Sequence, residues 1–345
     1  MDINILTEKE AVTLKEWIAA SEHIVICAHK SPDGDALGSS LAWREYLFGL
    51  GKNAMVVMPD ASPDFLQWLP GSERVVRYDK RTELAKIILE KADLIFCLDF
   101  CNPTRVETMR DALMASPARK VIIDHHLNPG NEMDMVISHP KLCSTCELIF
   151  RIVWQLGDFG KMTRKWATCV YCGMMTDTGG FTYNSNAPAI FFIIGELLTK
   201  HIDKDLIYRK VYNNYNASAI RLRGYLMDKK LEVWDDLHAA CFSFTREEMK
   251  RYHFIKGDVE GLVNHPLRIK RLKLSVSLRE DTDQEKLIYV SLRSVDDFPC
   301  NEMAERFFHG GGHLNAAGGK LFCSMGEAQK AVWEAIEAYS DKLRS

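Results

Sequence analysis

The first half of this 345-residue chain alternates short apolar segments with segments of helical character. The apolar segments predict strands at residues 23–28, 53–58, 93–98, 120–123 and 135–138. The segments between them predict helices at residues 35–50, 83–92 and 106–115. Strands that alternate with helices indicate a parallel sheet with helices on both faces, and ligands bind such sheets beyond the carboxyl ends of the strands. Functional residues are therefore expected at the strand ends.

The second half of the chain has a different order of elements. Three further helices are predicted at residues 146–156, 164–175 and 187–200. Later segments predict strands at 239–244, 272–278 and 287–292, a helix at 301–308, and then one more strand and a final helix at 326–343. The predicted fold class is α/β, with a parallel, doubly wound N-terminal domain (1–202), a helical linker (203–234) and a smaller mixed α/β C-terminal domain (235–345).

Composition limits the classes of function. Hydrophobic residues make up 47% of the chain and charged residues 26%, which is typical of a soluble globular protein without a membrane span. The net charge of −3 argues against binding of long duplex nucleic acid and leaves short anionic substrates as candidates. The first ten residues lack the apolar stretch of a signal peptide, so we expect a cytoplasmic location and free thiols for the ten cysteines.

Histidines and aspartates gather after the predicted strands and after one helix. They are His29, Asp33 and Asp35 after the first strand, Asp99 after the third, Asp124, His125 and His126 after the fourth, and Asp177 after an apolar helix. Carboxylates with some imidazole suit Mn²⁺ or Mg²⁺ better than a structural zinc site, which prefers thiolates. The set exceeds the needs of one ion, and it predicts two ions about 3.5–4 Å apart that share a bridging carboxylate.

Each of these residues has a simpler explanation when it is taken alone. Asp33 and Asp35 could stabilise the start of a helix, and Asp99 could be a solvated acid at a sheet end. Asp177 could belong to a helix C-terminal turn, although a carboxylate there opposes the helix dipole. Two Cys-x-x-Cys pairs, which begin at Cys143 and Cys169, resemble a zinc ribbon but fall in apolar helical segments, so we interpret them as core residues.

Taken in order, the His and Asp clusters resemble the four motifs of the DHH phosphoesterases. The second half adds Arg293-Ser294, the Asn-Glu-Met-Ala segment at 301–304 and three glycines before His313, which are similar to the DHH-associated substrate domain. The resemblance covers about residues 20–325, and it is strongest to the nanoRNase and pAp phosphatase branch. One departure is His309, which stands where the family has the first of four glycines.

The resemblance implies an Mn²⁺-dependent enzyme whose active site lies in the cleft between the two domains. One Mn²⁺ would be held by His29, Asp33 and Asp99, and the other by Asp35, Asp99, His125 and Asp177, with Mg²⁺ or another divalent ion as an alternative. Asp99 would bridge the ions, His126 would touch the scissile phosphate, and Asp124 would orient its neighbours. The implied substrate-binding residues are Arg293, Ser294, Asn301, Gly310, Gly311, Gly312 and His313.

The expected reaction is the hydrolysis of very short single-stranded RNA oligonucleotides to mononucleotides and the removal of the 3′-phosphate of pAp. Phosphodiesterases for linear or cyclic dinucleotides and exopolyphosphatases use the same metal chemistry and are the alternatives within the enzyme class. A module that binds nucleotides without turnover is an alternative of another class, although no metal-ligand position is visibly lost. A homodimer is expected from the family alone.

Overall fold

The structure is a computed structural model that describes residues 3–127 and 133–344. The chain divides into two compact units, Met1–Asn214 and Tyr215–Ser345. In the described part of the chain, no helix combines the length and the apolar character that a membrane span requires.

The first unit is built around a six-stranded sheet in which all neighbouring strands are parallel. Its strands are β1 (Ile24–Cys27), β2 (Ala54–Met58), β3 (Val76–Arg77), β4 (Leu94–Leu98), β5 (Arg119–Asp124) and β6 (Met135–Ser138). Their order across the sheet is β3-β2-β1-β4-β5-β6, so the direction of winding reverses between β1 and β4. Ligands bind open parallel sheets at such a reversal, beyond the carboxyl ends of the strands. The predicted parallel α/β architecture is confirmed.

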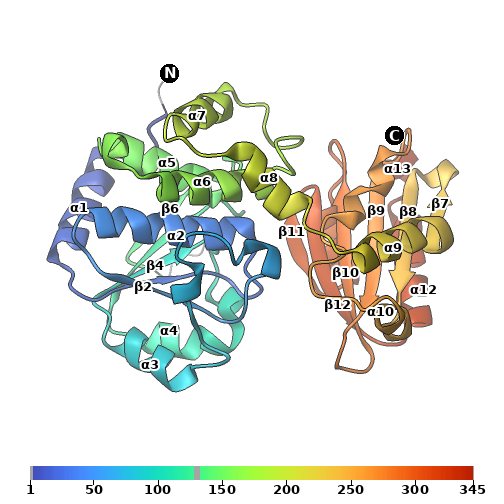
Figure 1. Cartoon of the computed structure of the whole chain (residues 1–345). Coiled ribbons are helices and arrows are strands. Elements are labelled where there is room, and N and C mark those ends of the chain that lie inside the picture. The colour runs from blue at the N-terminus through green and yellow to red at the C-terminus, as the bar shows by residue number, and fades with distance from the viewer. Residues whose placement is uncertain (1–2, 128–132, 345) are drawn as a thin grey trace. The chain divides into compact units, whose positions relative to one another are not determined.

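Helices cover both faces of this sheet (Figure 1). One face carries α2 (Gly34–Gly49), α5 (Thr145–Gln155) and α6 (Arg164–Asp177), and the other carries α3 (Thr82–Glu90) and α4 (Arg110–Ala115). The unit also contains α1 (Glu8–Ala20), α7 (Pro188–Leu198) and α8 (Lys204–Tyr212). Strand side chains alternate between the two faces, and all four residues of β1 are buried. The near-continuous apolar runs of the central strands are explained by this two-sided burial.

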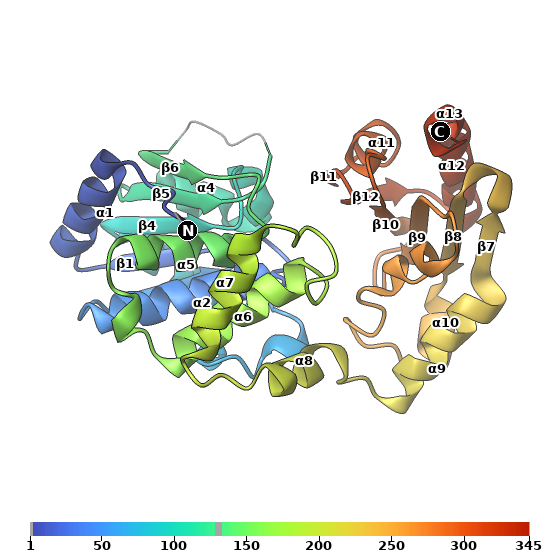
Figure 2. The same ribbon diagram turned by 90° about the horizontal axis from the view of Figure 1, so that it is seen from above.

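Glycines allow α2, α5 and α6 to pack closely, as Figure 2 shows from above. A Cβ placed on Gly38 of α2 would lie 2.7 Å from the carbonyl oxygen of Cys169 in α6. A Cβ placed on Gly173 of α6 would lie 2.2 Å from Sγ of Cys146 in α5. Because both distances are shorter than real Cβ contacts, larger residues would push these helices apart.

One expected helix of the first unit is irregular. The segment predicted as a helix at 106–115 is a 3₁₀ turn at Pro103–Met109 followed by the short helix α4. Glu107 has a φ of 41°, which lies in the left-handed region and interrupts the helical path. The uniform helical prediction for this segment is therefore wrong.

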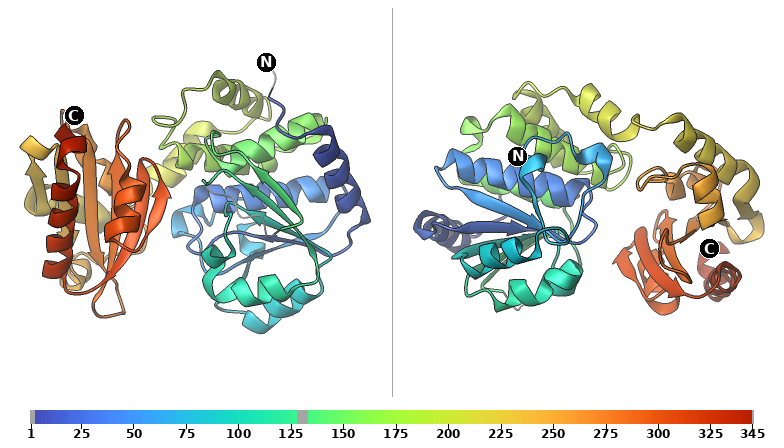
Figure 3. Two further views of the ribbon diagram at one scale, coloured as in Figure 1. Left: turned by 180° about the vertical axis from the view of Figure 1, so that it is seen from behind. Right: turned by 60° about the horizontal axis from the view of Figure 1, so that its bottom comes forward.

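The second unit contains a mixed six-stranded sheet with helices on both faces (Figure 3). Its strands are β7 (Leu231–Trp234), β8 (Ala239–Phe244), β9 (Leu274–Glu280), β10 (Leu287–Ser294), β11 (Gly311–His313) and β12 (Ala316–Phe322), in the order β11-β12-β10-β9-β8-β7. Only β8 and β9 run parallel among the neighbouring pairs. One face is covered by α11 (Cys300–Phe307) and α12 (Met325–Ala338), and the other by α9 (Ala217–Tyr225) and α10 (Arg246–Arg251). A short helix, α13 (Ser340–Arg344), follows, and the predicted mixed α/β class is confirmed.

The segment 203–234, which the sequence predicts as a helical linker, is divided between the two units. α8 belongs to the first unit, whereas α9 and β7 belong to the second. The helical prediction is wrong for Leu231–Trp234, because these residues pair antiparallel with β8 as the edge strand of the second sheet. The expected final helix at 326–343 is likewise divided into α12 and α13.

Candidate metal centre

The carboxyl ends of three neighbouring strands carry most of the residues that were predicted for the metal centre. β4 lies between β1 and β5, with Cys27 opposite Cys97 and Leu98 opposite Ile123. The residues at these ends are His29 after β1, Asp99 after β4, and Asp124, His125 and His126 at the end of β5. The N-terminus of α2 adds Asp33 and Asp35, and Asp177 is the last residue of α6. Segments that are distant in sequence therefore bring all predicted metal ligands together.

Asp99 occupies the middle of this arrangement. Its Oδ2 lies 3.4 Å from Nε2 of His29, and its Oδ1 lies 3.6 Å from Nε2 of His125. Its backbone has a φ of 62°, a left-handed conformation that costs energy for a residue other than glycine. The side chain is almost completely buried. A carboxylate that faces a histidine with each of its oxygens has the geometry of a bridge between two cations.

The ligand atoms form two groups on either side of Asp99. In each group the atoms lie within 4.8 Å of one another, and the groups are His29 with Asp33 and Asp99, and Asp35 with His125 and Asp177. A third group with the same spacing contains Asp99, Asp124 and His126. The first two groups correspond to the two ligand sets that the family resemblance implies. The difference is that the resemblance places Asp99 in both sets, whereas of these two groups only the first contains it.

The hydrogen bonds of the histidines turn Nε2 of each ring toward the carboxylates. Nδ1 of His29 lies 2.8 Å from the carbonyl oxygen of Lys30, and Nδ1 of His125 lies 3.2 Å from that of Leu142. A carbonyl oxygen only accepts, so Nδ1 donates in both residues and Nε2 is the nitrogen that faces the carboxylates. Nε2 of His125 lies 3.3 Å from Oδ2 of Asp177, another acceptor. Acceptors that converge in this way need either protons or a metal ion between them.

Asp33 combines the two roles that its sequence position suggested. Its Oδ1 accepts hydrogen bonds from the backbone N–H groups of Asp35 and Ala36, each at 3.0 Å, and so caps α2. Its Oδ2 lies 3.9 Å from Nε2 of His29 and belongs to the first ligand group. The helix cap therefore orients this carboxylate toward the centre rather than competing with a metal-binding role.

The N-terminus of α5 donates to Asp35, a contact that the sequence did not indicate. The backbone N–H of Thr145 donates to Oδ2 of Asp35 at 2.6 Å, and that of Cys146 donates to Oδ1 at 2.8 Å. The Thr145 hydroxyl lies 2.9 Å from Oδ1 of Asp99. The only sequence signal was the helix-start pattern Ser144-x-x-Glu147, which marks a helix but not the carboxylates that it meets.

Burial and mutual repulsion set the protonation of the central groups. Burial and the negative charge of Asp99 raise the pKa of Asp35 well above its usual range. Burial also disfavours the charged form of Asp99, but the hydrogen bond with His29 and the charge of His126 hold the pKa of Asp99 well below its usual range. Burial alone would lower the pKa of His29 and of His125. The neighbouring carboxylates, above all Asp99, have the larger effect, so the pKa of both histidines is raised. Without a metal ion, protons therefore supply part of the compensating charge.

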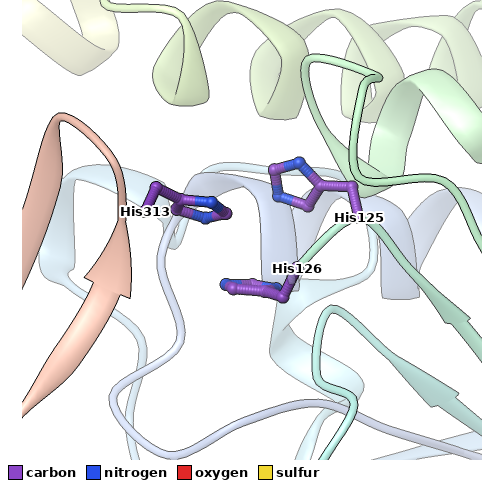
Figure 4. Close-up of side chains that lie close together, drawn as sticks. All are labelled: His125, His126 and His313. Atoms are coloured by element: carbon purple, nitrogen blue, oxygen red, sulfur yellow. The ribbon is translucent and has the colours of Figure 1, made fainter. Parts of the chain in front are cut away.

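Asp124 orients His126 at the edge of this centre. Nδ1 of His126 lies 2.7 Å from Oδ1 of Asp124, whose side chain is completely buried. Figure 4 shows the His125 and His126 rings beside one another, with centroids 5.0 Å apart in an edge-on arrangement. Oδ2 of Asp124 is buried and has no hydrogen-bond partner among the described residues. This contact agrees with the supporting role that the family resemblance implies for the Asp124 carboxylate.

The predicted substrate-binding residues of the second unit lie on β10, α11 and β11, except for Gly310, which directly precedes β11. Arg293 is half-buried and donates from Nη1 to the carbonyl oxygen of Leu292 at 2.9 Å. Ser294 is buried, and its hydroxyl donates to the carbonyl oxygen of Phe298 at 2.8 Å and accepts from Asn315 at 2.9 Å, so it is already used in the fold. Oδ1 of Asn301 is buried without a hydrogen-bond partner in the described residues.

Two of the three glycines before His313 are required by the packing against β12. Gly311, Gly312 and His313 form β11, which pairs antiparallel with β12. A Cβ placed on Gly310 would lie 1.8 Å from the carbonyl oxygen of Gly318, and a Cβ placed on Gly312 would lie 2.4 Å from that of Ala316. His309 has a φ of 49°, a left-handed conformation that favours glycine. The residue that departs from the family pattern thus adopts a backbone conformation that a glycine would adopt at lower cost.

The Cys-x-x-Cys pairs belong to the core, as interpreted from the sequence. Cys143, Cys146, Cys169 and Cys172 are all buried, and burial raises the pKa of each thiol. Among residues 3–127 and 133–344, the groups of ligand atoms with metal-binding spacing contain no cysteine.

Comparisons with known proteins agree with this arrangement. A model of the DHH family N-terminal domain matches residues 23–174, and a model of the DHHA1 domain matches residues 248–341. A crystal structure of an exopolyphosphatase-related protein from Bacteroides fragilis is 48% identical, with a TM-score of 0.93 over 99% of this chain and 100% of that chain. A probable bifunctional oligoribonuclease and PAP phosphatase from Streptococcus mutans is 26% identical over 90% of this chain and 93% of its own length. A cyclic-di-AMP phosphodiesterase from Listeria monocytogenes is 26% identical over 94% of this chain, which spans 49% of that relative.

Proposed function

This chain belongs to the DHH family of phosphoesterases, and from this premise we propose that it hydrolyses short oligoribonucleotides to mononucleotides and removes the 3′-phosphate of pAp. The observation that carries the proposal is the pair of ligand groups on either side of Asp99. The substrate class is supported by the oligoribonuclease and PAP phosphatase from Streptococcus mutans, which this chain matches along nearly the whole length of both proteins.

We propose that the cofactor is a pair of divalent cations, with Mn²⁺ as the first candidate. The ligands would be His29, Asp33, Asp35, Asp99, His125 and Asp177. Carboxylates and imidazole suit Mn²⁺ and Mg²⁺, and the Nε2 atoms are aimed inward by the backbone carbonyls that hold Nδ1. When bound, such ions supply the Lewis acidity that activates water and neutralises charge on a phosphoryl oxygen.

The protein's own residues would orient the reaction. Asp99 would keep the two ligand groups together, because its Oδ2 faces His29 and its Oδ1 faces His125. His126 donates from Nδ1 to Asp124, so its Nε2 can hydrogen-bond to the scissile phosphate. The hydrogen bond to Asp124 holds the ring with Nε2 turned away from this carboxylate.

In the second unit, Arg293, Asn301, Gly310, Gly311, Gly312 and His313 are proposed to bind the phosphate and sugar of the substrate. The Arg293 guanidinium offers several N–H donors to a phosphate group. Ser294 contributes mainly by holding the turn after β10, since its hydroxyl is engaged by Phe298 and Asn315. The cytoplasmic location and the homodimer expected from the sequence stay predictions.

Polyphosphate is the second candidate substrate, because the Bacteroides fragilis protein with 48% identity is described as exopolyphosphatase-related. Cyclic dinucleotides are a further candidate from the Listeria monocytogenes relative, of which this chain spans only half. These candidates share the metal centre and differ in what the second unit must bind.

One substrate panel tests the proposal. Purified protein with Mn²⁺ is incubated with pApA, pAp, cyclic di-AMP and polyphosphate, and the products are separated by anion-exchange chromatography. We expect AMP from pApA and from pAp, and loss of both activities in Asp99→Asn, which keeps the left-handed backbone accessible. Asp111→Asn, at an exposed carboxylate on α4, is the matched control and should retain activity. Metal-loaded protein that leaves both pApA and pAp intact would refute the proposal.

A further inference from the structure

We propose that Thr145 is a positioning residue of the metal centre. Its hydroxyl and its backbone N–H would hold the carboxylates of Asp99 and Asp35 in the orientation that two cations require. The inference rests on the proposed function, because these carboxylates act as ligands only when ions bind.

Thr145 contacts one carboxylate of each ligand group. Its Oγ1 lies 2.9 Å from Oδ1 of Asp99, and its backbone nitrogen lies 2.6 Å from Oδ2 of Asp35. An ionised carboxylate only accepts hydrogen bonds, so both groups of Thr145 donate. Thr145 is completely buried, so water does not replace these donors. The contact with Asp35 spans 110 positions of the chain, which makes Thr145 a link between separate segments.

The first turn of α5 holds Thr145 in place before any ion binds. Ser144 caps the helix and accepts a hydrogen bond from the backbone N–H of Glu147 at 3.0 Å. Glu147 in turn accepts from the backbone N–H of Cys143 at 2.8 Å and pairs with Arg151 at 2.6 Å. All four side chains are buried. A turn fixed by this many buried contacts can act as a template for the two carboxylates.

The contacts leave room for metal ions on the same carboxylates. Each carboxylate offers about four lone-pair positions. Asp35 uses two of them for the N–H groups of Thr145 and Cys146, and the positive end of the α5 dipole faces it. Asp99 accepts from the Thr145 hydroxyl with Oδ1 and still faces His29 with Oδ2. Donors of this kind fix the orientation of metal ligands, and their loss typically lowers metal affinity by roughly 10- to 100-fold.

The test compares Mn²⁺ binding by Thr145→Val, which removes only the hydroxyl, with Thr145→Ser, which keeps it. Isothermal titration calorimetry gives the affinity, and the Mn²⁺ electron paramagnetic resonance spectrum reports coupling between two ions. We expect Thr145→Val to lose roughly 10- to 100-fold in affinity and to weaken the coupled signal. Thr145→Ser should restore most of both. Thr168→Val is the matched control, because its half-buried hydroxyl donates only to the carbonyl oxygen of Arg164 in α6.

Three outcomes would overturn the inference. They are wild-type affinity and coupling in folded Thr145→Val, no recovery in Thr145→Ser, and no Mn²⁺ binding by the wild-type protein. Circular dichroism and thermal unfolding verify that each variant folds, and Thr145→Ala replaces Thr145→Val if the valine variant does not. If the wild-type protein binds two Mn²⁺ ions but hydrolyses none of the substrate panel, the proposed function fails while the comparison of Thr145 variants still decides the positioning role.

Discussion

Gly34 lies so close to Thr176 that a Cβ on the glycine would come within 2.2 Å of the threonine hydroxyl oxygen. Gly34 directly precedes Asp35, and Thr176 directly precedes Asp177. The approach of α2 to α6 at this point therefore sets the separation of two carboxylates in one ligand group. The glycine of the Asp-Gly-Asp motif is needed for this close helix packing.

Gly34→Ala should lower both stability and metal affinity. The added methyl group must move Thr176, and overpacking of this kind costs about 1–3 kcal/mol. Urea unfolding and calorimetric Mn²⁺ titration measure the two effects, and adding Thr176→Ala should recover part of each. Gly49→Ala at the end of α2 is the control, because nothing lies within 4 Å of a Cβ placed there. Equal behaviour of Gly34→Ala and Gly49→Ala would contradict the packing argument.

Metal binding should release protons and become tighter as the pH rises. Asp35, His29 and His125 have raised pKa values in the metal-free protein, so each binds protons more strongly than an unperturbed group. Metal ligands must be deprotonated, and the incoming ion therefore displaces protons. Between about pH 6 and about pH 8 we expect the apparent Mn²⁺ affinity to increase. Calorimetry in two buffers of different ionisation enthalpy counts the protons, and a binding enthalpy independent of buffer would disprove their release.

Asp124→Asn should reduce turnover much more than metal binding. The amide oxygen can still accept from His126, but a neutral amide accepts a weaker hydrogen bond than a carboxylate and holds the ring less firmly. We expect kcat to fall by roughly 100-fold, the usual size of an acid–base contribution. The Mn²⁺ affinity should change little, because Asp124 is proposed as a support. Asp124 also lies in a third group with metal-binding spacing, so a parallel loss of affinity and kcat would make it a ligand instead.

His309→Gly should stabilise the second unit. The histidine has a φ of 49°, and relief of this left-handed conformation should stabilise the folded state by about 1 kcal/mol. The greater conformational entropy of glycine in the unfolded chain reduces this gain. Thermal unfolding should show a higher midpoint for His309→Gly. Gly310→Ala should show a lower one, because its Cβ would strike the Gly318 carbonyl oxygen. An unchanged or lower midpoint for His309→Gly would mean that the histidine makes contacts that compensate for its backbone.

The strands and the ligand residues could be predicted because both leave local patterns in the sequence. β4 is an uninterrupted apolar run that ends at an acid, and this pattern located Asp99 directly. Asp33 and Asp35 could be grouped with His29 because all three residues follow the same predicted strand. The structure brings these residues together, as the parallel order of β1, β4 and β5 required.

Other features depend on contacts that no local pattern reports. Thr145 follows a recognisable helix-start residue, but nothing nearby in sequence indicates that it meets Asp35 and Asp99. β7 was predicted as helical because Leu231–Trp234 is short and follows helical segments, and only pairing with β8 makes it a strand. The resemblance implies substrate binding by the glycines at 310–312, and the steric need for Gly310 and Gly312 becomes visible only beside β12.

Each unit has its own hydrophobic cores, since the buried clusters of the first unit and those of the second share no residue. Substitutions that reshape one core therefore leave the packing of the other unchanged. For the evolution of such chains, this separation means that each unit can accept core substitutions under its own packing constraints. If the second unit binds the substrate as proposed, substrate preference would change faster than the chemistry, by mutation or by exchange of the whole second unit between genes.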